Sequence, residues 1–347
     1  MYISEGIYFR EVSMSKKRIR VIHYGLGPIG LETARLVLNK STLEIVGAVD
    51  ISQNMIGKDL GTILGIEKNT GITVHENLDK LLSGIKADIV IHTAGSRIRT
   101  IYSQLEEIIQ AGLNVVSSSE ELLFPSEENK ALTEELDNKA KDQGVTVLGT
   151  GINPGFIMDA FPLYLTSVCQ DVKTIKVERM VDAGTRRYPL QKKVGAGLTP
   201  EQFRTMVSEK MLGHVGLVES LQFIAHYLGL SFDNVEETID PVIAEYPVKT
   251  AYFDLKKGDV LGIKHIVNGM KNNETIVNLD LRMYVGADDP HDAIYINGIP
   301  NISLRIDVGV AGDQATAAIL VNSIHDVIAA QPGLVTVKDL PAPHFCR

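Results

Sequence analysis

Residues 18–30 read Arg18-Ile-Arg-Val-Ile-His-Tyr-Gly-Leu-Gly-Pro-Ile-Gly30, so that a short β-branched strand runs directly into a glycine-rich turn. The turn has the spacing G-x-G-x-x-G. In a dinucleotide-binding unit the first glycine permits a tight turn, the second lets the backbone approach a pyrophosphate, and the third lets a helix pack closely on the sheet. We expect this turn to hold a pyrophosphate at the N-terminus of that helix. The predicted cofactor-binding residues here are Gly25, Leu26, Gly27, Pro28, Ile29 and Gly30.

The residues after the turn complete a strand–helix–strand unit. A helix follows the last glycine, and a second strand over residues 43–49 ends at Asp50. A carboxylate about 20 residues after the last glycine is typical of the group that binds the adenosine ribose. Its charge accepts hydrogen bonds from the ribose 2′-hydroxyl and repels a 2′-phosphate, so we expect NAD as the cofactor. Lys58 is near enough in sequence for NADP to be accepted as well.

Composition sets the broad class. A chain of 347 residues suits two domains, each large enough to bury its own core. Apolar runs stay well short of the ~18 residues that a membrane span needs, and the net charge of −9 comes without the clustered basic face that nucleic acid requires. The two cysteines, Cys169 and Cys346, form neither a disulfide framework nor a metal-ligand spacing. We expect a soluble, cytoplasmic protein with no membrane or nucleic-acid partner.

The order of expected elements divides the chain. Residues 1–13 carry Glu5 and Glu11 and lack the basic and apolar segments of a signal peptide, so we expect an N-terminal tail, and Met14 is a second candidate start. Strands and helices then alternate, which predicts a Rossmann-type α/β domain with a doubly wound parallel sheet over residues 14–153. The expected strands lie at 72–75, 88–95, 113–116 and 145–149, and the expected helices at 98–111 and 126–143.

Beyond residue 153 the pattern changes. Longer alternating strands predict a second α+β domain over residues 154–310, with a mixed or antiparallel sheet and roles in substrate binding and dimerisation. We expect its strands at 172–181, 246–255, 260–267, 275–285 and 302–308, and its helices at 154–170, from Thr199 and at 216–227. Residues 311–347 are expected to form a helix, over 312–330, and a tail that pack back on the first domain.

Ligands of open α/β sheets bind at the carboxyl ends of the strands. After the strand at 88–95 we expect Thr93, Ala94 and Ser96 to lie near a cofactor ribose, although Thr93 and Ser96 suit equally well as caps of the next helix. After the strand at 145–149, Asn153 offers a donor and an acceptor to a nicotinamide carboxamide. The alternative for this glycine-rich segment is a simple turn between the domains.

Two adjacent carboxylates follow the strand at 113–116. Glu120 and Glu121 precede an apolar run, and a carboxylate beside apolar side chains has its pKa raised and becomes useful as a base. The alternative is a solvated charge pair at a helix start. We predict that these two are the catalytic candidates and favour Glu120, which is nearer the strand end.

The second domain supplies candidates for substrate binding. Arg179, Tyr188 and His265 are the predicted substrate residues, with Arg186 and Arg187 nearby, because such groups can meet a carboxylate. His23, inside the first strand, is expected to be a packed residue. The spacings predict no metal site and no hydrolase triad.

The motifs also carry a resemblance. Residues 21–30, Ser119-Glu-Glu-Leu122, Gly149-Thr-Gly-Ile-Asn-Pro-Gly-Phe156, Gly312-Asp-Gln-Ala-Thr316 and Leu340-Pro-Ala-Pro-His-Phe345 together resemble the 2,4-diaminopentanoate dehydrogenases, a group that includes native amine dehydrogenases. The resemblance covers nearly all of residues 16–345. The wider relatives are dihydrodipicolinate reductases, but their histidine pair, lysine and Pro-Ser-Gly-Thr substrate signature are absent here.

The resemblance implies an NAD(P)-dependent oxidative deamination of an amine such as 2,4-diaminopentanoate to a ketone and ammonia, with reductive amination as the reverse. It also implies that a glutamate of the segment Ser119–Leu122 handles the amine, and that the protein is a homodimer. Two alternatives remain open: a cyclic imine reductase of the dihydrodipicolinate type, and a protein that senses NAD(H) without turnover. A carboxylate bound by Arg179 or a neighbour would favour a diamino acid, whereas an apolar pocket with Phe156 and Tyr188 would favour simple amines.

Overall fold

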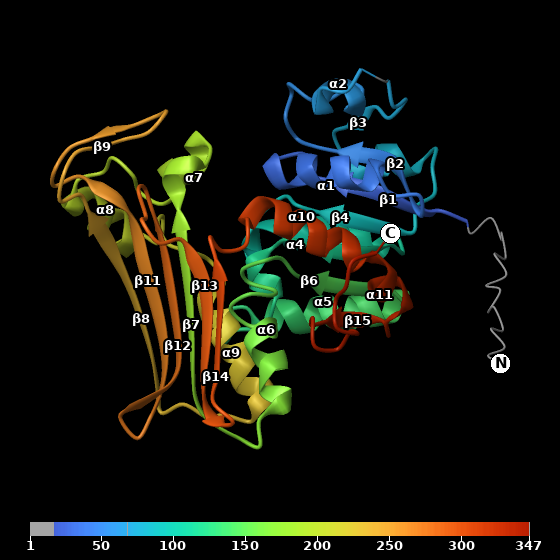
Figure 1. Ribbon diagram of the computed structural model, residues 1–347. Helices are drawn as coiled ribbons and strands as arrows, with labels where there is room; N and C mark the ends of the chain where they lie inside the picture. Colours follow the sequence, from blue (N-terminus) through green and yellow to red (C-terminus); the bar gives the residue numbers. More distant parts are fainter. Residues whose placement is uncertain (1–16, 68, 347) are drawn as a thin grey trace, which may run out of the picture.

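The computed structural model describes residues 17–67 and 69–346, so the tail predicted for residues 1–13 lies outside the described residues. The molecule contains two sheets that lie side by side, the second on the left and the first on the right in Figure 1. The first has seven parallel strands in the order β15-β6-β5-β4-β1-β2-β3. They are β1 (Ile19–Tyr24), β2 (Leu43–Val49), β3 (Val74–His75), β4 (Ile89–His92), β5 (Asn114–Ser117), β6 (Thr146–Gly149) and β15 (Gly333–Val335).

Helices cover both faces of this sheet. They are α1 (Pro28–Leu38), α2 (Leu60–Leu64), α3 (Leu78–Leu82), α4 (Ile98–Gln110), η1 (Glu120–Leu122), α5 (Lys130–Gln143), α10 (Gly312–Asn322) and α11 (Ile324–Ala329). Because both faces are covered, β4 is buried along its whole length and reads as a continuous apolar run before His92. The strand order reverses between β1 and β4, which makes that point the expected ligand crevice of a doubly wound sheet. The predicted Rossmann-type α/β fold is confirmed.

The second sheet is mixed. Its six strands lie in the order β14-β13-β7-β12-β11-β8, and of its neighbours only β7 and β12 run parallel. They are β7 (Asp171–Asp182), β8 (Asn234–Ile243), β11 (Val260–Lys271), β12 (Glu274–Tyr284), β13 (His291–Ile299) and β14 (Ile302–Asp307). The same part of the chain contains α6 (Ala160–Leu165), η2 (Thr166–Val168), η3 (Ala183–Thr185), α7 (Tyr188–Lys193), α8 (Pro200–Ser208), α9 (Leu217–Leu228) and the short strands β9 (Val248–Lys249) and β10 (Asp254–Leu255).

Several expected elements of the second part differ from the structure. The helix expected over 154–170 begins only at Ala160, because residues 150–158 form a turn fastened by the buried carboxylate of Asp159. The strand expected over 246–255 is a small hairpin of β9 and β10. β8 and β13 were not predicted; β8 is an edge strand that carries charges and Pro241, features that an edge tolerates but that weaken a strand pattern.

The C-terminal segment returns to the first sheet, where α10 lies beside α1 and β15 pairs with β6 (Figure 1). The single helix expected over 312–330 is divided at Ser323, whose hydroxyl donates to the carbonyl oxygen of Ile319 at 2.7 Å. A serine hydroxyl bonded to the preceding turn commonly bends a helix. β15 was not predicted, since three residues are too few to form a pattern.

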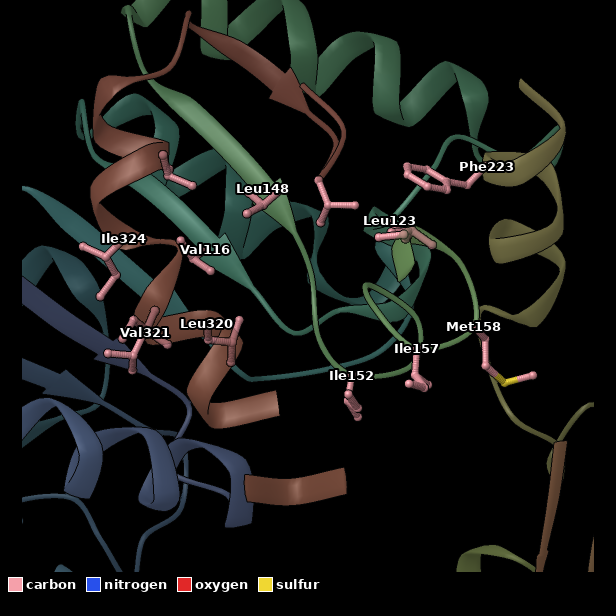
Figure 2. Close-up of a cluster of buried hydrophobic side chains, with 14 of the residues drawn as sticks. Val116, Leu123, Leu148, Ile152, Ile157, Met158, Phe223, Leu320, Val321 and Ile324 are labelled. Atoms are coloured by element: carbon pink, nitrogen blue, oxygen red, sulfur yellow. The ribbon is translucent and has the colours of Figure 1, made fainter. Parts of the chain in front are cut away.

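A hydrophobic core joins the two parts of the molecule. Val116 of β5 and Leu148 of β6 belong to the same buried cluster as Leu320 of α10 and Phe223 of α9 (Figure 2). α9 in turn packs on β11 and β12 of the second sheet. The cluster therefore fixes the second sheet relative to the carboxyl ends of the first. No helix of the described residues is long and apolar enough to span a membrane.

Candidate active site

A cleft with a volume of about 320 Å³ lies at the carboxyl ends of the parallel strands. The first sheet contributes residues that follow β4, β5 and β6, among them Ser96, Glu120 and Asn153. The second part of the chain contributes side chains from β7 and from the segment 186–193. The cleft thus lies where the fold predicts a ligand site.

The glycine turn is shaped to receive a ligand. Gly25 has φ +92°, and a Cβ on Gly30 would overlap the carbonyl oxygen of Gly25, so both positions require glycine. Gly27, the N-cap of α1, differs because a Cβ there would meet no atom within 4 Å. The backbone at Gly27 therefore faces open space at a helix N-terminus, which fits a pyrophosphate.

Asp50, which directly follows β2, is hydrogen-bonded to the glycine turn. Its Oδ2 accepts a hydrogen bond from the N–H of Leu26 at 2.6 Å, and its Oδ1 accepts one from the N–H of Ser52 at 2.7 Å. Each carboxylate oxygen keeps a lone pair for a ribose hydroxyl. Asp50 therefore has a structural role in the turn in addition to the ribose contact predicted for it.

Of the three residues predicted after β4, two line the cleft. The hydroxyl of Thr93 donates to the carbonyl oxygen of Gly25 at 2.7 Å, and Ser96 lies beside Glu120. Ala94 is exposed and does not line the cleft. Neither Thr93 nor Ser96 caps α4, because the carboxylate of Glu121 does so.

Glu120 and Glu121 have different surroundings. Oε2 of Glu121 accepts from the N–H of Ile98 at the start of α4, at 2.9 Å, and Oε1 lies 3.7 Å from Arg97. Glu120 instead lines the cleft. Burial raises the pKa of the Glu120 carboxyl, and the positive charge of Lys193 and a hydrogen bond from Ser96 oppose part of that rise.

Asn153 lies in the turn that follows β6. Asp159 fixes that turn: its Oδ2 accepts from the N–H of Gly155 at 2.9 Å and from the hydroxyl of Ser220 at 2.8 Å. The side-chain Oδ1 of Asn153 is buried at the cleft without a hydrogen-bond partner. A buried acceptor left unpaired costs free energy unless a ligand donates to it, so this atom fits a carboxamide N–H.

His214 also lines the cleft and was not predicted. Its Nε2 donates to the carbonyl oxygen of Asn153 at 3.2 Å, and its backbone N–H donates to Nδ1 of His265 at 3.3 Å. Burial, together with the positive charge of Lys193, lowers the pKa of His214 to about 3, so the ring is neutral at physiological pH. His265 is itself buried and holds Glu237 through Nε2 at 2.8 Å. It therefore supports the loop of His214 and does not line the cleft.

The other predicted substrate residues are placed as follows. Arg179 reaches the cleft wall, but its Nη1 donates to both oxygens of Asp292, at 2.6 and 2.7 Å, and its Nη2 donates to the carbonyl oxygen of Val310. Tyr188 stacks on Phe253 with ring centroids 5.6 Å apart and does not line the cleft. Arg186 and Arg187 do line it.

Lys193 and Asp313 are further cleft residues that sequence reasoning missed. Asp313, in the first turn of α10, pairs with Arg186 at 3.0 Å and with Arg187 at 3.4 Å. Lys193 ends the short helix α7, where its spacing from the preceding arginines was the one available signal. His214 had only flanking glycines, Gly213 and Gly216, to mark its loop.

His23, predicted to be a packed residue, is buried in β1, and neither ring nitrogen has a hydrogen-bond partner. Burial lowers the pKa of His23 to about 3. Within residues 17–67 and 69–346, no group of three or more His, Cys, Asp or Glu side chains is arranged to hold a metal ion.

Comparisons with known proteins assign each of the two parts of the chain to a family. Residues 19–147 match the family described as dihydrodipicolinate reductase, N-terminus, and residues 156–346 match the 2,4-diaminopentanoate dehydrogenase C-terminal domain. The 2,4-diaminopentanoate dehydrogenase of Acetoanaerobium sticklandii is 32% identical over 338 residues, which are 94% of this chain and 94% of that protein.

Solved structures of other proteins have the same fold. The amine dehydrogenase of Mycobacterium smegmatis has a TM-score of 0.84 and 27% identity, and the match covers 94% of this chain and 97% of that one. Dihydrodipicolinate reductase from Paenisporosarcina sp. TG-14 has a TM-score of 0.54 at 14% identity, covers 93% and 99%, and shows only the shared fold.

The glycine turn, the switch-point cleft and the match to a dinucleotide-binding N-terminal family define a two-part, nicotinamide-dependent oxidoreductase. The second half of the chain specifies which kind. The protein belongs to the family of 2,4-diaminopentanoate dehydrogenases and amine dehydrogenases, as the sequence motifs predicted, and it is a dehydrogenase that acts on amines.

Proposed function

We propose that this protein catalyses the NAD(P)-dependent oxidative deamination of an amine such as 2,4-diaminopentanoate to a ketone and ammonia, and the reverse reductive amination. The observation that carries the proposal is the position of Glu120, a half-buried residue whose carboxyl pKa is raised by burial, in a cleft between the glycine turn and a cationic wall. The family membership sets the reaction class.

The residues present fit a nicotinamide dinucleotide. The open backbone at Gly27 suits its pyrophosphate, Asp50 suits its adenosine ribose, and the unpaired Oδ1 of Asn153 suits its carboxamide. When bound, the nicotinamide exchanges a hydride with the carbon that carries the nitrogen. We propose NAD as the preferred form, because the charge of Asp50 repels a 2′-phosphate.

Glu120 supplies the acid–base chemistry in this proposal. Its carboxylate holds the substrate ammonium, accepts a proton from it to leave the neutral amine, and stabilises the positive charge of the iminium that remains after oxidation. Water then adds to the iminium carbon, and ammonia leaves after proton transfer to nitrogen. Neutral His214, whose Nε2 proton is committed to Asn153, has Nδ1 as an acceptor suited to hold that water.

Separate replacement of the two glutamates tests the role of Glu120. We expect Glu120→Gln to lower kcat by about 100-fold or more, because an amide cannot accept the proton, and to leave NADH affinity within a few-fold. Glu121→Gln is the matched control: its amide oxygen still caps α4, so activity stays within about threefold. Steady-state kinetics with an amine and NAD, together with NADH fluorescence titrations, measure both effects. A fully active Glu120→Gln would contradict the assignment.

We further propose, by analogy with the family, that the protein is a cytoplasmic homodimer. Size-exclusion chromatography with light scattering tests the oligomeric state, and a monomer at micromolar concentration would refute it.

A further inference from the structure

The wall of the cleft opposite the first sheet carries more positive than negative charge. Its segment 186–193 presents Arg186, Arg187 and Lys193, and only one carboxylate, that of Asp313, pairs with the two arginines. Lys193 is exposed and forms no ion pair with a carboxylate of the described residues. Nε of Arg187 is buried without a hydrogen-bond partner. In a chain with a net charge of −9, this local excess of cationic donors favours the binding of an anionic ligand.

Two anionic groups are available to a cleft of this kind: the pyrophosphate of the dinucleotide and a carboxylate of the substrate. The pyrophosphate is expected at Gly27 and α1, and Arg186 lies on that side, with its Nη atoms within 4 Å of the position of a Cβ on Gly312, in the first turn of α10. Lys193 instead lines the cleft together with Glu120 and His214, and its positive charge acts on both. It therefore belongs to the end of the cleft where the amine reacts.

Arg179 was predicted from the sequence to bind such an anion, but its guanidinium is already paired within the protein. Its Nη1 is held by Asp292 and its Nη2 by the carbonyl oxygen of Val310, and the pair is almost wholly buried. Opening this pair would leave Asp292 buried and uncompensated, which is costly. In the segment 186–193, Arg186 and Arg187 share Asp313, so the groups left for a substrate are Lys193 and the unpaired Nε of Arg187.

We propose that Lys193, assisted by Nε of Arg187, binds a carboxylate on the substrate while Glu120 holds the amine that is oxidised. This inference rests on the proposed function and adds the residues that determine its specificity: Lys193 and Arg187 select amines that carry a carboxylate a few carbons from the reacting centre over amines without one. Two opposite charges at two points of the cleft orient such a substrate, because its ammonium and its carboxylate each have one place to bind.

A pair of substrates isolates the carboxylate. 2,4-Diaminopentanoate and 1,3-diaminobutane are the same diamine with and without that group. For the wild type we expect a higher kcat/KM with 2,4-diaminopentanoate. For Lys193→Met we expect kcat/KM to fall about 10- to 100-fold with 2,4-diaminopentanoate, as for the loss of a charge-assisted hydrogen bond, and to change less than about threefold with 1,3-diaminobutane. Lys193→Arg should restore most of the loss.

Lys192→Met is the matched control, because Lys192 is exposed like Lys193 but does not line the cleft. Each variant is assayed at its own pH optimum, since removing Lys193 also changes the electrostatic environment of Glu120. Equal losses with both diamines, or no loss with either, would overturn the subsite. A rise in the KM for NAD as the main effect would assign Lys193 to the pyrophosphate and overturn it too.

A binding measurement separates this inference from the proposed function. Calorimetric titration of 4-oxopentanoate into the NADH complex should show a Kd about tenfold or more weaker for Lys193→Met than for wild type. If the wild type oxidised no amine yet showed this difference, the proposed function would fail and the carboxylate subsite would stand. If amines were oxidised and 4-oxopentanoate bound both proteins equally, the subsite would fail and the function would stand.

Discussion

At the scale of single residues, adjacency in sequence says little about environment. Glu120 and Glu121 open the same short helical turn, η1, yet one side chain lines the cleft and the other caps α4. Successive residues of a 3₁₀ helix point in directions about 120° apart, so neighbours naturally diverge. The preference for Glu120 over Glu121 rested on its distance from the strand end, and the geometry now supplies a physical reason for it.

The raised pKa of Glu120 predicts the pH dependence of the reaction. Glu120 must be ionised to accept a proton from the ammonium, and burial favours its neutral form, so activity should fall as the pH drops through a value above the ordinary 4.5. The acid limb of the kcat/KM profile measures this value for the free enzyme. We expect that limb in the wild type and in Glu121→Gln. An acid limb at or below 4.5 would contradict the assignment.

Other residue roles depend on distant partners and were beyond sequence reasoning. Arg179 was predicted to bind substrate, but its role is set by Asp292, which is 113 positions away. His265 was predicted for the same purpose, and its partners Glu237 and the N–H of His214 also come from other elements. An ionisable side chain shows its type in the sequence, whereas its pairing is a property of the fold.

At the scale of elements, the local sequence pattern predicted a strand where both faces of the strand are buried, and it predicted the start of a helix where a capping residue is present. The strands β1, β2, β4, β5 and β6 followed from apolar runs. The start of α8 followed from Thr199 as N-cap and Pro200 after it, and the structure adds a capping box between Thr199 and Gln202. The helix predicted from residue 154 was wrong over 154–159, where the chain continues the turn after Gly149, because that turn depends on Asp159 and on Ser220 of α9. The edge strand β8 lacks a buried face to impose alternation.

Two alanine substitutions in the glycine turn separate cofactor binding from folding. Gly27→Ala should fold normally, because alanine tolerates the φ of −63° at Gly27 and its Cβ meets no protein atom, but the methyl occupies the space of the pyrophosphate. We expect NADH affinity to fall about tenfold or more with little change in Tm. Gly30→Ala should lower Tm itself, because its Cβ overlaps the Gly25 carbonyl oxygen.

Fluorescence titration with NADH and thermal unfolding measure both changes. Unchanged NADH affinity in Gly27→Ala would contradict the placement of the dinucleotide. The same titration compares cofactors: the wild type should bind NADH at least as tightly as NADPH because of Asp50, and a tenfold preference for NADPH would contradict that role.

At the scale of the whole molecule, function depends on how two sheets are held. The core shared by Val116, Leu320 and Phe223 fixes the second sheet against the carboxyl ends of the first (Figure 2). This brings residues near 120, 153 and 193 to one cleft. The sequence motifs identified the family, and they predict the dinucleotide end of that cleft. On the opposite wall the sequence suggested Arg179, Arg186 and Arg187 but missed Lys193 and His214, because that wall forms only when the second part of the chain folds onto the first.

We propose that this cleft joins a ketone and ammonia, and the most direct test is NADH oxidation with and without ammonium. With a ketone such as 2-amino-4-oxopentanoate present, we expect oxidation to require ammonium, to rise with its concentration, and to yield the amine by mass spectrometry. Oxidation of NADH at the same rate without ammonium, with the alcohol or a reduced cyclic imine as product, would contradict the account.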